Sequence, residues 1–352
     1  MNEHPEVRAR LLENIGRAYR RRLEFKNAIS YFRDAAHIRK KMSEREAGDE
    51  ATAVVLVELA VSMRDDRDVL GSDAVLIDAA NMLQRLHLER SLTYAKMLAN
   101  RGRVQMKLGK PDAARKFFDD SLALLRDLRG PRDTEVAALL VEESNAFMWQ
   151  ENLVAAEENA RAAVDIYATT LPELHPDRVY AQAQWGEVLR FQGRLDEASV
   201  VLKEALNANR RIYKEPNSRV ADILDSLAQI KLAQHSLAEA ETYAQEAVDL
   251  QLKGEGPNHW RTGYYRTSLA AIQLEEKKYA AAEAELRAAI PAFETSLAGD
   301  HPYIAAAEHY LGEVLLRTNR LKDAEAVFMA AMNRSKHANE PQWLYGDRKS
   351  VV

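Results

Sequence analysis

Residues 176–213, PDRVYAQAQWGEVLRFQGRLDEASVVLKEALNANRRIY, decide the fold of this chain. Apolar residues recur every three or four positions on both sides of Gly193, the pattern of amphipathic helices. We therefore predict one helix over 176–192 and a second over 195–213. The glycine between them is suited to the left-handed conformation that ends many helices.

Three small residues of this stretch, Gly186, Ala198 and Ala205, each belong to a series that runs through the chain. After one step of 44 residues, each series repeats every 42 residues. Every member is Ala, Gly or Ser, types that make up about a quarter of the chain, so chance does not explain the pattern. The members are Gly16, Ala60, Gly102, Ser144, Gly186, Ala228, Ala270 and Gly312; Ala28, Ser72, Ala114, Ala156, Ala198, Ala240, Ala282 and Ala324; and Ala35, Ala79, Ser121, Ala163, Ala205, Ala247, Ala289 and Ala331.

Small side chains at fixed intervals let neighbouring helices pack closely. The sequence therefore predicts an all-α solenoid of eight helix pairs, in which each pair contacts only its neighbours. We expect the repeats to occupy residues 1–338, followed by a C-terminal tail. The predicted repeats are 5–46, 47–88, 89–130, 131–172, 173–214, 215–256, 257–298 and 299–338, and the tail is 339–352.

The repeat resembles the tetratricopeptide repeat, in which Leu-Gly, Tyr, Ala, Phe and Ala stand at fixed offsets. The first repeat carries this pattern as Ile15-Gly16, Tyr19, Ala28, Phe32 and Ala35, and the eighth as Leu311-Gly312, Leu315, Ala324, Phe328 and Ala331. The usual repeat has about 34 residues. The eight extra residues correspond to about two helical turns, so we expect each helix to be one turn longer.

His-Pro precedes the first helix of three repeats, at His4-Pro5, His175-Pro176 and His301-Pro302. With the 42-residue period, this feature is similar to the arrays of kinesin light chains and many bacterial signalling proteins. The resemblance implies a right-handed superhelix that binds other proteins. Because this repeat serves many systems, it predicts the fold more sharply than the function.

Composition disfavours several classes of function. The net charge is −5 and the pI is about 6.1, whereas nucleic-acid-binding domains are usually basic. The chain has no cysteine, which excludes disulfides and thiol catalysis. No apolar run approaches the roughly 18 residues that cross a membrane. The N-terminal MNEHPEVRAR has no apolar signal core, so we expect a cytoplasmic protein.

The histidines are the first candidates for metal ligands. His175, His259 and His301 occupy one position of the repeat, where Asp133 and Asn217 stand in other repeats. Equivalent residues one repeat apart should be on the order of 10 Å from each other, too far to share a metal ion. We interpret them as residues that cap helix N-termini. With no phosphate-binding loop, dinucleotide fingerprint or nucleophile elbow, we expect no metal, no cofactor and no enzymatic activity.

The resemblance implies that the first helix of each repeat lines a concave groove. Residues 1–45 contain 12 Lys and Arg against six Asp and Glu, so the N-terminal part of this groove is basic. In the family an asparagine often holds the peptide backbone, which makes Asn14 and Asn100 the best single candidates. The predicted peptide-binding residues are Arg10, Asn14, Arg17, Arg21, Arg64, Lys96, Asn100, Arg103, Lys107, Tyr180 and Gln184.

Two of these assignments have alternatives. The run Arg20-Arg21-Arg22 is also typical of a solvated helix end, where basic residues complement the helix dipole. Aromatic and apolar residues at groove positions, such as Trp149 and Phe191, are equally consistent with core packing. Further, Arg101 and Glu143 replace apolar residues and suggest a buried charge pair, and Pro291 should kink or end its helix.

We therefore predict a non-enzymatic scaffold for protein-protein interaction that holds an extended, acidic peptide or partner segment in its groove. The alternative is a regulatory or self-association module of a larger signalling protein, such as one with a bacterial Ser/Thr kinase or ATPase upstream. In that alternative the chain could form a homodimer through its terminal repeats. We expect neither nucleic acid nor a membrane as a partner.

Overall fold

The structure is a computed structural model that describes residues 4–22, 24–43, 49–213, 216–297, 299 and 301–335. These residues form sixteen α-helices and contain no β-strand. The chain divides after Thr170 into two compact halves, here called the N-terminal half and the C-terminal half. The predicted tail, residues 339–352, lies outside the described residues.

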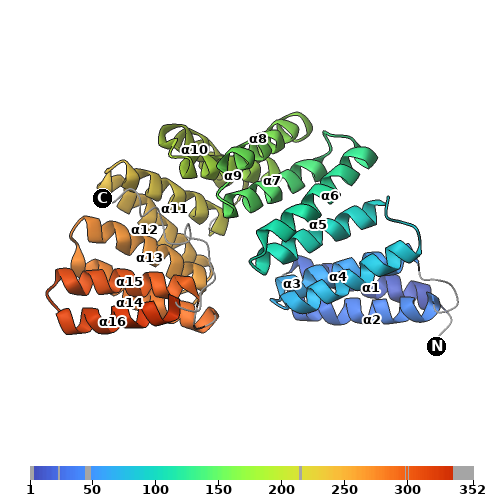
Figure 1. Cartoon of the computed structure of the whole chain (residues 1–352), viewed down its shortest axis with the longest axis horizontal. Coiled ribbons are helices and arrows are strands. Elements are labelled where there is room, and N and C mark those ends of the chain that lie inside the picture. Colours follow the sequence, from blue (N-terminus) through green and yellow to red (C-terminus); the bar gives the residue numbers. More distant parts are fainter. Residues whose placement is uncertain are drawn as a thin grey trace. The chain divides into compact units, whose positions relative to one another are not determined.

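Each half contains four helix pairs, as Figure 1 shows. The N-terminal half consists of α1 (Pro5–Arg21), α2 (Phe25–Ser43), α3 (Glu50–Asp65), α4 (Val69–Arg85), α5 (Leu92–Lys107), α6 (Pro111–Arg129), α7 (Thr134–Trp149) and α8 (Leu153–Thr170). The C-terminal half consists of α9 (Pro176–Phe191), α10 (Leu195–Ile212), α11 (Ser218–Ala233), α12 (Leu237–Gly254), α13 (Trp260–Glu275), α14 (Tyr279–Ser296), α15 (Pro302–Arg317) and α16 (Leu321–Ser335). The two helices predicted from residues 176–213 are α9 and α10, and their bounds agree with the prediction to within one residue.

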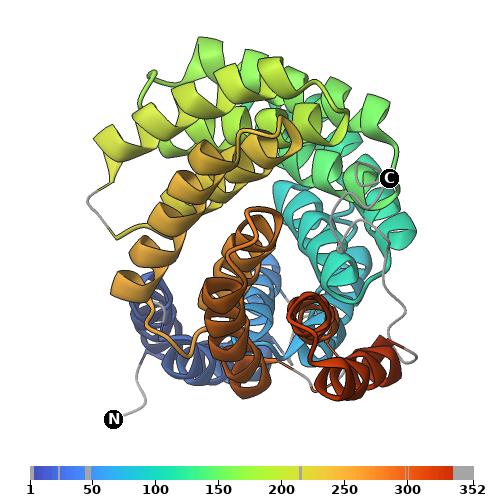
Figure 2. The same ribbon diagram turned by 90° about the vertical axis from the view of Figure 1, so that its left-hand side faces the viewer.

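The helices stack in the same way throughout each half. Each odd-numbered helix packs on the even-numbered helix that follows it, and that helix packs on the next odd-numbered helix of the half. Figure 2 shows the two helices of a pair running side by side. Within each half every pair therefore contacts its neighbours in the chain, which is the arrangement of an α-solenoid.

The small-residue series lies where the helices touch. All 24 positions are buried, as expected if they separate packed helices. At Gly102 an added Cβ would lie 2.2 Å from the ring of Phe118, and at Gly312 it would lie 2.6 Å from the ring of Phe328. Since neither distance leaves room for a methyl group, the glycines are required by the close approach of the two helices. The predicted fold class, a helical repeat solenoid, is confirmed.

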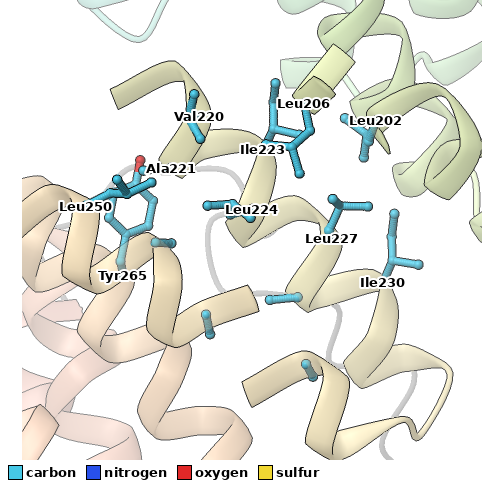
Figure 3. Close-up of a cluster of buried hydrophobic side chains, with 14 of the residues drawn as sticks. Leu202, Leu206, Val220, Ala221, Ile223, Leu224, Leu227, Ile230, Leu250 and Tyr265 are labelled. Carbon is cyan, nitrogen blue, oxygen red and sulfur yellow. The ribbon is translucent and has the colours of Figure 1, made fainter. Parts of the chain in front are cut away.

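Large side chains fill the space that the small ones leave. Figure 3 shows such a cluster in the C-terminal half, where Leu202 of α10, Leu224 and Leu227 of α11, and Tyr265 of α13 meet. Each of these four side chains is at most 1% exposed. Burying one such side chain contributes roughly 1.5–3 kcal/mol. The stacking contacts between pairs are therefore the main source of stability in each half.

The turn inside each pair uses one residue with a positive φ. Gly109, Gly193 and Asn319 adopt φ values of 68°, 74° and 60°, which confirms the left-handed conformation predicted for Gly193. Residues without special freedom fill the same position in the other described pairs: Arg67, Glu151, His235 and Lys277. The position is thus fixed by the packing of the two helices and not by the residue type.

Two expectations about irregular residues need correction. Of the two outcomes expected at Pro291, a kink or an end of the helix, the end does not occur, because α14 continues to Ser296 and Phe293 beyond the proline is buried. Arg101 and Glu143 do not pair with each other. Arg101 lies 3.8 Å from Asp73, and Glu143 accepts a hydrogen bond of 2.7 Å from Asn159.

Candidate functional site

The odd-numbered helices form the inner face of each half. Successive odd-numbered helices contact one another, namely α3 with α5 and α5 with α7, and α9 with α11, α11 with α13 and α13 with α15. The even-numbered helices of the described residues show no comparable contact with each other. Because the odd-numbered helices lie closer to one another than the even-numbered helices do, each stack curves toward its odd-numbered side. The odd-numbered helices therefore form the concave surface, on which a ligand can lie.

The four predicted residues of α1 lie at or near the surface. Arg10 is exposed and pairs with Glu6 at 3.0 Å. Asn14 is exposed and accepts a hydrogen bond of 3.3 Å from Nη1 of Arg17. Arg21 is exposed in the last turn of the helix. Arg10, Arg17 and Arg21 thus give the described surface of α1 three basic side chains.

The structure brings together three predicted residues of α3 and α5. Asn100 Oδ1 accepts hydrogen bonds from Arg64 at 3.1 Å and from Arg103 at 3.4 Å. Its Nδ2 donates to the carbonyl oxygen of Lys96 at 2.8 Å. Asn100 is only 8% exposed, so its amide is already engaged inside the protein. Of the two asparagines singled out, Asn14 is the one that presents its side chain to solvent.

Acidic residues that were not predicted hold the arginines in place. Glu58 of α3 pairs with Arg17 at 3.5 Å and also with Arg20 of α1. Glu142 of α7 pairs with Arg103 of α5 at 3.2 Å. The repeat register contains the signal that would have found them, because Asn14, Glu58, Asn100 and Glu142 all lie two residues before the first small residue of their repeats.

Two predicted lysines lie on α5. Lys96 is exposed and pairs with Glu135 of α7 at 2.9 Å, whereas Lys107 is exposed at the end of the helix. On α1, α3 and α5, arginine or lysine therefore reaches an acid or amide on the next odd-numbered helix, as far as α7. These links cross from repeat to repeat on the inner face of the N-terminal half.

The C-terminal half places the last two predicted residues, Tyr180 and Gln184, on α9. Tyr180 is 37% exposed, and the guanidinium of Arg219 on α11 lies 5.1 Å from its ring centroid. Gln184 is half-buried one turn later. These two residues belong to the C-terminal half, whereas the other nine predicted residues belong to the N-terminal half.

In the C-terminal half, hydrogen bonds of hydroxyl, carboxyl and amide groups link α11 to α13. Tyr265 donates from its hydroxyl to Asp222 Oδ1 at 2.5 Å, and Arg261 approaches the other oxygen of Asp222 at 3.4 Å. One turn farther along, Gln229 Nε2 donates to Ser268 Oγ at 2.6 Å. Each of these bonds joins α11 to α13.

Asp225 is one of two buried acids in the described part of the C-terminal half, the other being Glu308. Asp225 of α11 is 5% exposed, and burial raises its pKa to about 6. The hydroxyl of Ser268 and the charge of Arg190 lower the pKa, while the charge of Glu187 raises it. Asp225 is not among the predicted peptide-binding residues, and its enclosure follows from the packing of α11 and not from a sequence motif.

Aromatic side chains extend the same face along α13 and α15. The rings of Tyr264 and Tyr303 have centroids 5.4 Å apart, and those of Trp260 and Tyr303 stack at 6.1 Å. Phe191, for which core packing and ligand binding were both open, is half-buried beneath the guanidinium of Arg190 at 4.2 Å. This face therefore combines ring surfaces with carboxylates, unlike the face of the N-terminal half.

The histidines cap helices, as predicted. The ring nitrogens Nδ1 of His175, His259 and His301 accept backbone N–H bonds at 3.2, 3.3 and 3.2 Å. Asp133 and Asn217 accept the same bond at 2.8 and 2.9 Å. Across the described ranges no group of three or more potential ligands is arranged to hold a metal ion. None of the helices in those ranges is both long and apolar enough to span a membrane.

Solved structures with the same fold come from several systems. A Rap protein in complex with Competence and Sporulation Factor is 16% identical, with a TM-score of 0.61, and the match covers 96% of this chain and 98% of that one. The apo form of the quorum sensor NprR from B. thuringiensis is 14% identical, with a TM-score of 0.62 and coverage of 90% and 86%. A putative kinesin light chain of Podosopora anserina with TPR-like repeats is 18% identical, with a TM-score of 0.50 and coverage of 58% and 96%. At these identities the likeness shows the fold alone.

Sequence comparison points the same way. A secreted RxLR effector protein, RXLR-C07 of Plasmopara halstedii, is 21% identical over 271 residues, which are 77% of this chain and 74% of the effector. Models described as tetratricopeptide repeat match residues 11–46, 95–124, 177–253 and 263–337. These matches lie in both halves and together cover more than half of the chain. Since the matched segments are also the stacked helix pairs with buried small residues, the chain belongs to the tetratricopeptide-repeat family.

Proposed function

We propose that this chain is a non-enzymatic scaffold that binds an extended segment of a partner protein along the inner faces of its odd-numbered helices. In the N-terminal half, the proposed ligand is acidic. The observation that carries this proposal is the row of guanidinium groups on α1, α3 and α5, formed by Arg17, Arg64 and Arg103. Arginine binds carboxylates through paired N–H donors, which makes such a row suited to an acidic chain.

The arginines of this row remain accessible. The side chains of Arg17 and Arg103 are 34% and 28% exposed, although each pairs with an acid of the neighbouring helix. Ion pairs of this exposure contribute only about 0–1 kcal/mol, so a carboxylate of the ligand can replace the internal partner at little cost. Arg21 and Lys107 are exposed and add further positive charge to the same face.

Asn14 supplies a different kind of contact. Its amide is exposed between the arginines of α1 and can both donate to and accept from a peptide backbone. A ligand would then be recognised by its carboxylates and held in register by its main chain. A Rap protein with a similar fold is solved in complex with Competence and Sporulation Factor, which supports ligand binding by such a fold and not the role of a particular residue.

The test uses a fluorescein-labelled 12-residue peptide of alternating Glu and Ala, and fluorescence anisotropy at two salt concentrations. We expect the intact chain to bind this peptide and to bind it less tightly at higher salt. Arg17→Glu should weaken binding about tenfold, which is about 1.4 kcal/mol, and Asn14→Ala should weaken it a few-fold. A peptide with Lys in place of Glu should not bind to the N-terminal half.

The matched control is Lys116→Glu, which makes the same change of charge at an exposed position of the even-numbered helix α6. It should leave the affinity unchanged. If Lys116→Glu and Arg17→Glu weaken binding equally, the peptide responds to net charge and not to the inner face. If the acidic peptide does not bind at all, the proposal for this half fails.

A further inference from the structure

Asp225 lies on the inner face of the C-terminal half with an unused hydrogen-bond acceptor. Its side chain is 5% exposed, and its Oδ1 has no hydrogen-bond partner among the described residues. The hydroxyls of Ser268 and Tyr264 are directed at the carboxylate and lower its pKa. An enclosed carboxylate oxygen without a donor is unfavourable, so its presence requires an explanation.

A second unused acceptor lies on the neighbouring helix α9. Glu187 Oε2 accepts two hydrogen bonds from Arg190, from Nε at 3.2 Å and from Nη2 at 3.1 Å. The other oxygen, Oε1, is enclosed and has no partner in the described part of the chain. The two acids are close enough for electrostatic repulsion, since the charge of Glu187 raises the pKa of Asp225. Arg190 is committed to Glu187, so it leaves the two free oxygens without a donor.

We propose that the inner face of the C-terminal half binds a lysine or arginine side chain of a partner segment between Asp225 and Glu187. This proposal rests on the proposed function, since it assumes that a partner segment lies along the odd-numbered helices. The cationic group would supply donors to the two oxygens that have none, Asp225 Oδ1 and Glu187 Oε1. An anionic group would instead meet the negative charges of Glu187, Asp222 and Asp225.

Three guanidinium groups of the C-terminal half already lie over aromatic rings. Arg190, Arg219 and Arg261 lie over the rings of Phe191, Tyr180 and Trp260 at 4.2, 5.1 and 5.3 Å. A cation near a ring face is attracted by the negative charge above the ring. The ring of Tyr264 is close enough to Asp225 for the charge of the acid to raise the tyrosine pKa, and it stands 5.4 Å from that of Tyr303. A further cation beside Asp225 would therefore find both a carboxylate and a ring face.

The experiment uses immobilised 12-residue peptides of Ala, Ser and Gly with one central residue, which is Arg, Lys, Gln or Glu. We expect the intact chain to bind the Arg and Lys peptides at least tenfold more tightly than the Gln peptide. Asp225→Asn should remove most of this preference and change the weak binding of the Gln peptide less than twofold. Glu187→Gln should reduce the preference less strongly, because Arg190 keeps part of its partner.

The control variant is Glu204→Gln, which removes a charge from an exposed position of α10. It should leave the preference for Arg intact. A second measurement follows the binding of the Arg peptide with pH. Burial raises the pKa of Asp225 to about 6, and the titratable or charged groups around it are Glu187, Arg190, Tyr264 and Tyr265. Binding of the Arg peptide should therefore weaken as the pH falls below 6 and Asp225 becomes protonated. Asp225→Asn should abolish this dependence even if it also alters stability.

Equal binding of the Arg and Gln peptides would overturn this inference, and so would an unchanged preference in Asp225→Asn. Neither result depends on Arg17 or on the acidic peptide, which test the N-terminal half. Loss of acidic-peptide binding with an intact preference for Arg would contradict only the proposal for that half. The two ideas can therefore fail independently.

Discussion

The inner faces of the two halves differ although their helices stack in the same way. In the N-terminal half, arginines of one repeat reach acids and amides of the next, as Arg103 reaches Glu142. In the C-terminal half, hydroxyls and rings take this place, and the acid Asp225 is buried among them. The buried small residues are the same in both. Stacking therefore fixes the framework, and the positions that it does not use are free to carry different binding chemistry.

The largest predicted effect concerns two ion pairs, one in each half, that each join the two helices of a terminal helix pair. Glu13 pairs with Arg39 at 2.6 Å in the first helix pair, and Glu308 pairs with Arg334 at 3.0 Å in the last. The side chain of Arg39 is 6% exposed and that of Arg334 is 26% exposed. Removing one partner of a buried pair leaves an uncompensated charge and costs about 3–5 kcal/mol. We expect Arg39→Ala to cost about 3 kcal/mol and Arg334→Ala distinctly less.

Urea unfolding, followed by hydrogen exchange of each half, measures both losses. Arg33→Ala, at an exposed position of the same helix as Arg39, should change the free energy of unfolding by less than about 0.5 kcal/mol. Equal losses for Arg39→Ala and Arg334→Ala would mean that burial does not distinguish the two pairs.

The next prediction compares two glycines of the same series. At Gly102 an added Cβ would lie 2.2 Å from Phe118, and at Gly186 it would lie 2.7 Å from Leu202. Both side chains are fully buried, but the overlap at Gly102 is deeper, and the rigid ring of Phe118 has fewer ways than Leu202 to relieve it. We expect Gly102→Ala to cost about 1–3 kcal/mol. Gly186→Ala should cost less than about 1 kcal/mol, because the gain in helix propensity offsets part of the overlap.

Thermal unfolding of the two variants, each compared with the wild type, gives the difference. If Gly186→Ala proves the more harmful change, the small residues are not required by the nearest large side chain. Hydrogen exchange in Gly102→Ala should show the loss of protection in α5 and α6 first, because repeats contact only their neighbours.

The framework was predictable from the sequence because it depends on a periodic requirement. A small residue is needed wherever two helices touch, so Gly186 and its equivalents marked every pair. The first residues of the helices were also predictable, since His175 and Asp133 occupy the same position of the repeat and both accept a backbone N–H bond at a helix N-terminus. Requirements that recur in each repeat leave a pattern, and a pattern can be read without the structure.

The inner faces were less predictable because their contacts are made once. Asn100 was singled out as a ligand for a peptide, yet its amide bonds to Arg64 and to the backbone of its own helix. Glu58 and Glu142 were missed although they lie at the same repeat position as Asn14. Whether an acid at this position faces an arginine depends on the residues of the neighbouring repeat, and no single repeat contains that information.

The third prediction compares two acids with raised pKa values. Burial and the nearby Asp119 raise the pKa of Glu143 to about 8, and burial raises that of Asp225 to about 6. A carboxyl group with a raised pKa destabilises the folded state as the pH rises from the unfolded pKa to the folded one. For Glu143 this range runs from about 4.5 to about 8, and for Asp225 from about 3.8 to about 6.

Between pH 6.5 and pH 9, therefore, ionisation of Glu143 should lower the stability of the N-terminal half. Asp225 changes the stability only at lower pH, below about 6. We expect Glu143→Gln to raise the melting temperature by about 2–4 °C at pH 9 and to change it little at pH 4. Differential scanning calorimetry at the two pH values measures the shift. A gain of the same size at both values would contradict the role assigned to ionisation of Glu143.

The smallest predicted effect tests whether the internal acids compete with a ligand. Glu58 lies between Arg17 and Arg20 and occupies the donors that an acidic peptide would use. Glu58→Gln removes the negative charge and keeps the shape, so the acidic peptide should bind about two- to five-fold more tightly, which corresponds to the worth of an exposed ion pair. The same change should not affect the Arg peptide, because Asp225 and Glu187 belong to the other half. If Glu58→Gln instead weakens binding of the acidic peptide, Glu58 holds the arginines in the positions that the ligand needs. The arginine row would then be a preorganised site, and the ligand would not displace Glu58 from the arginines.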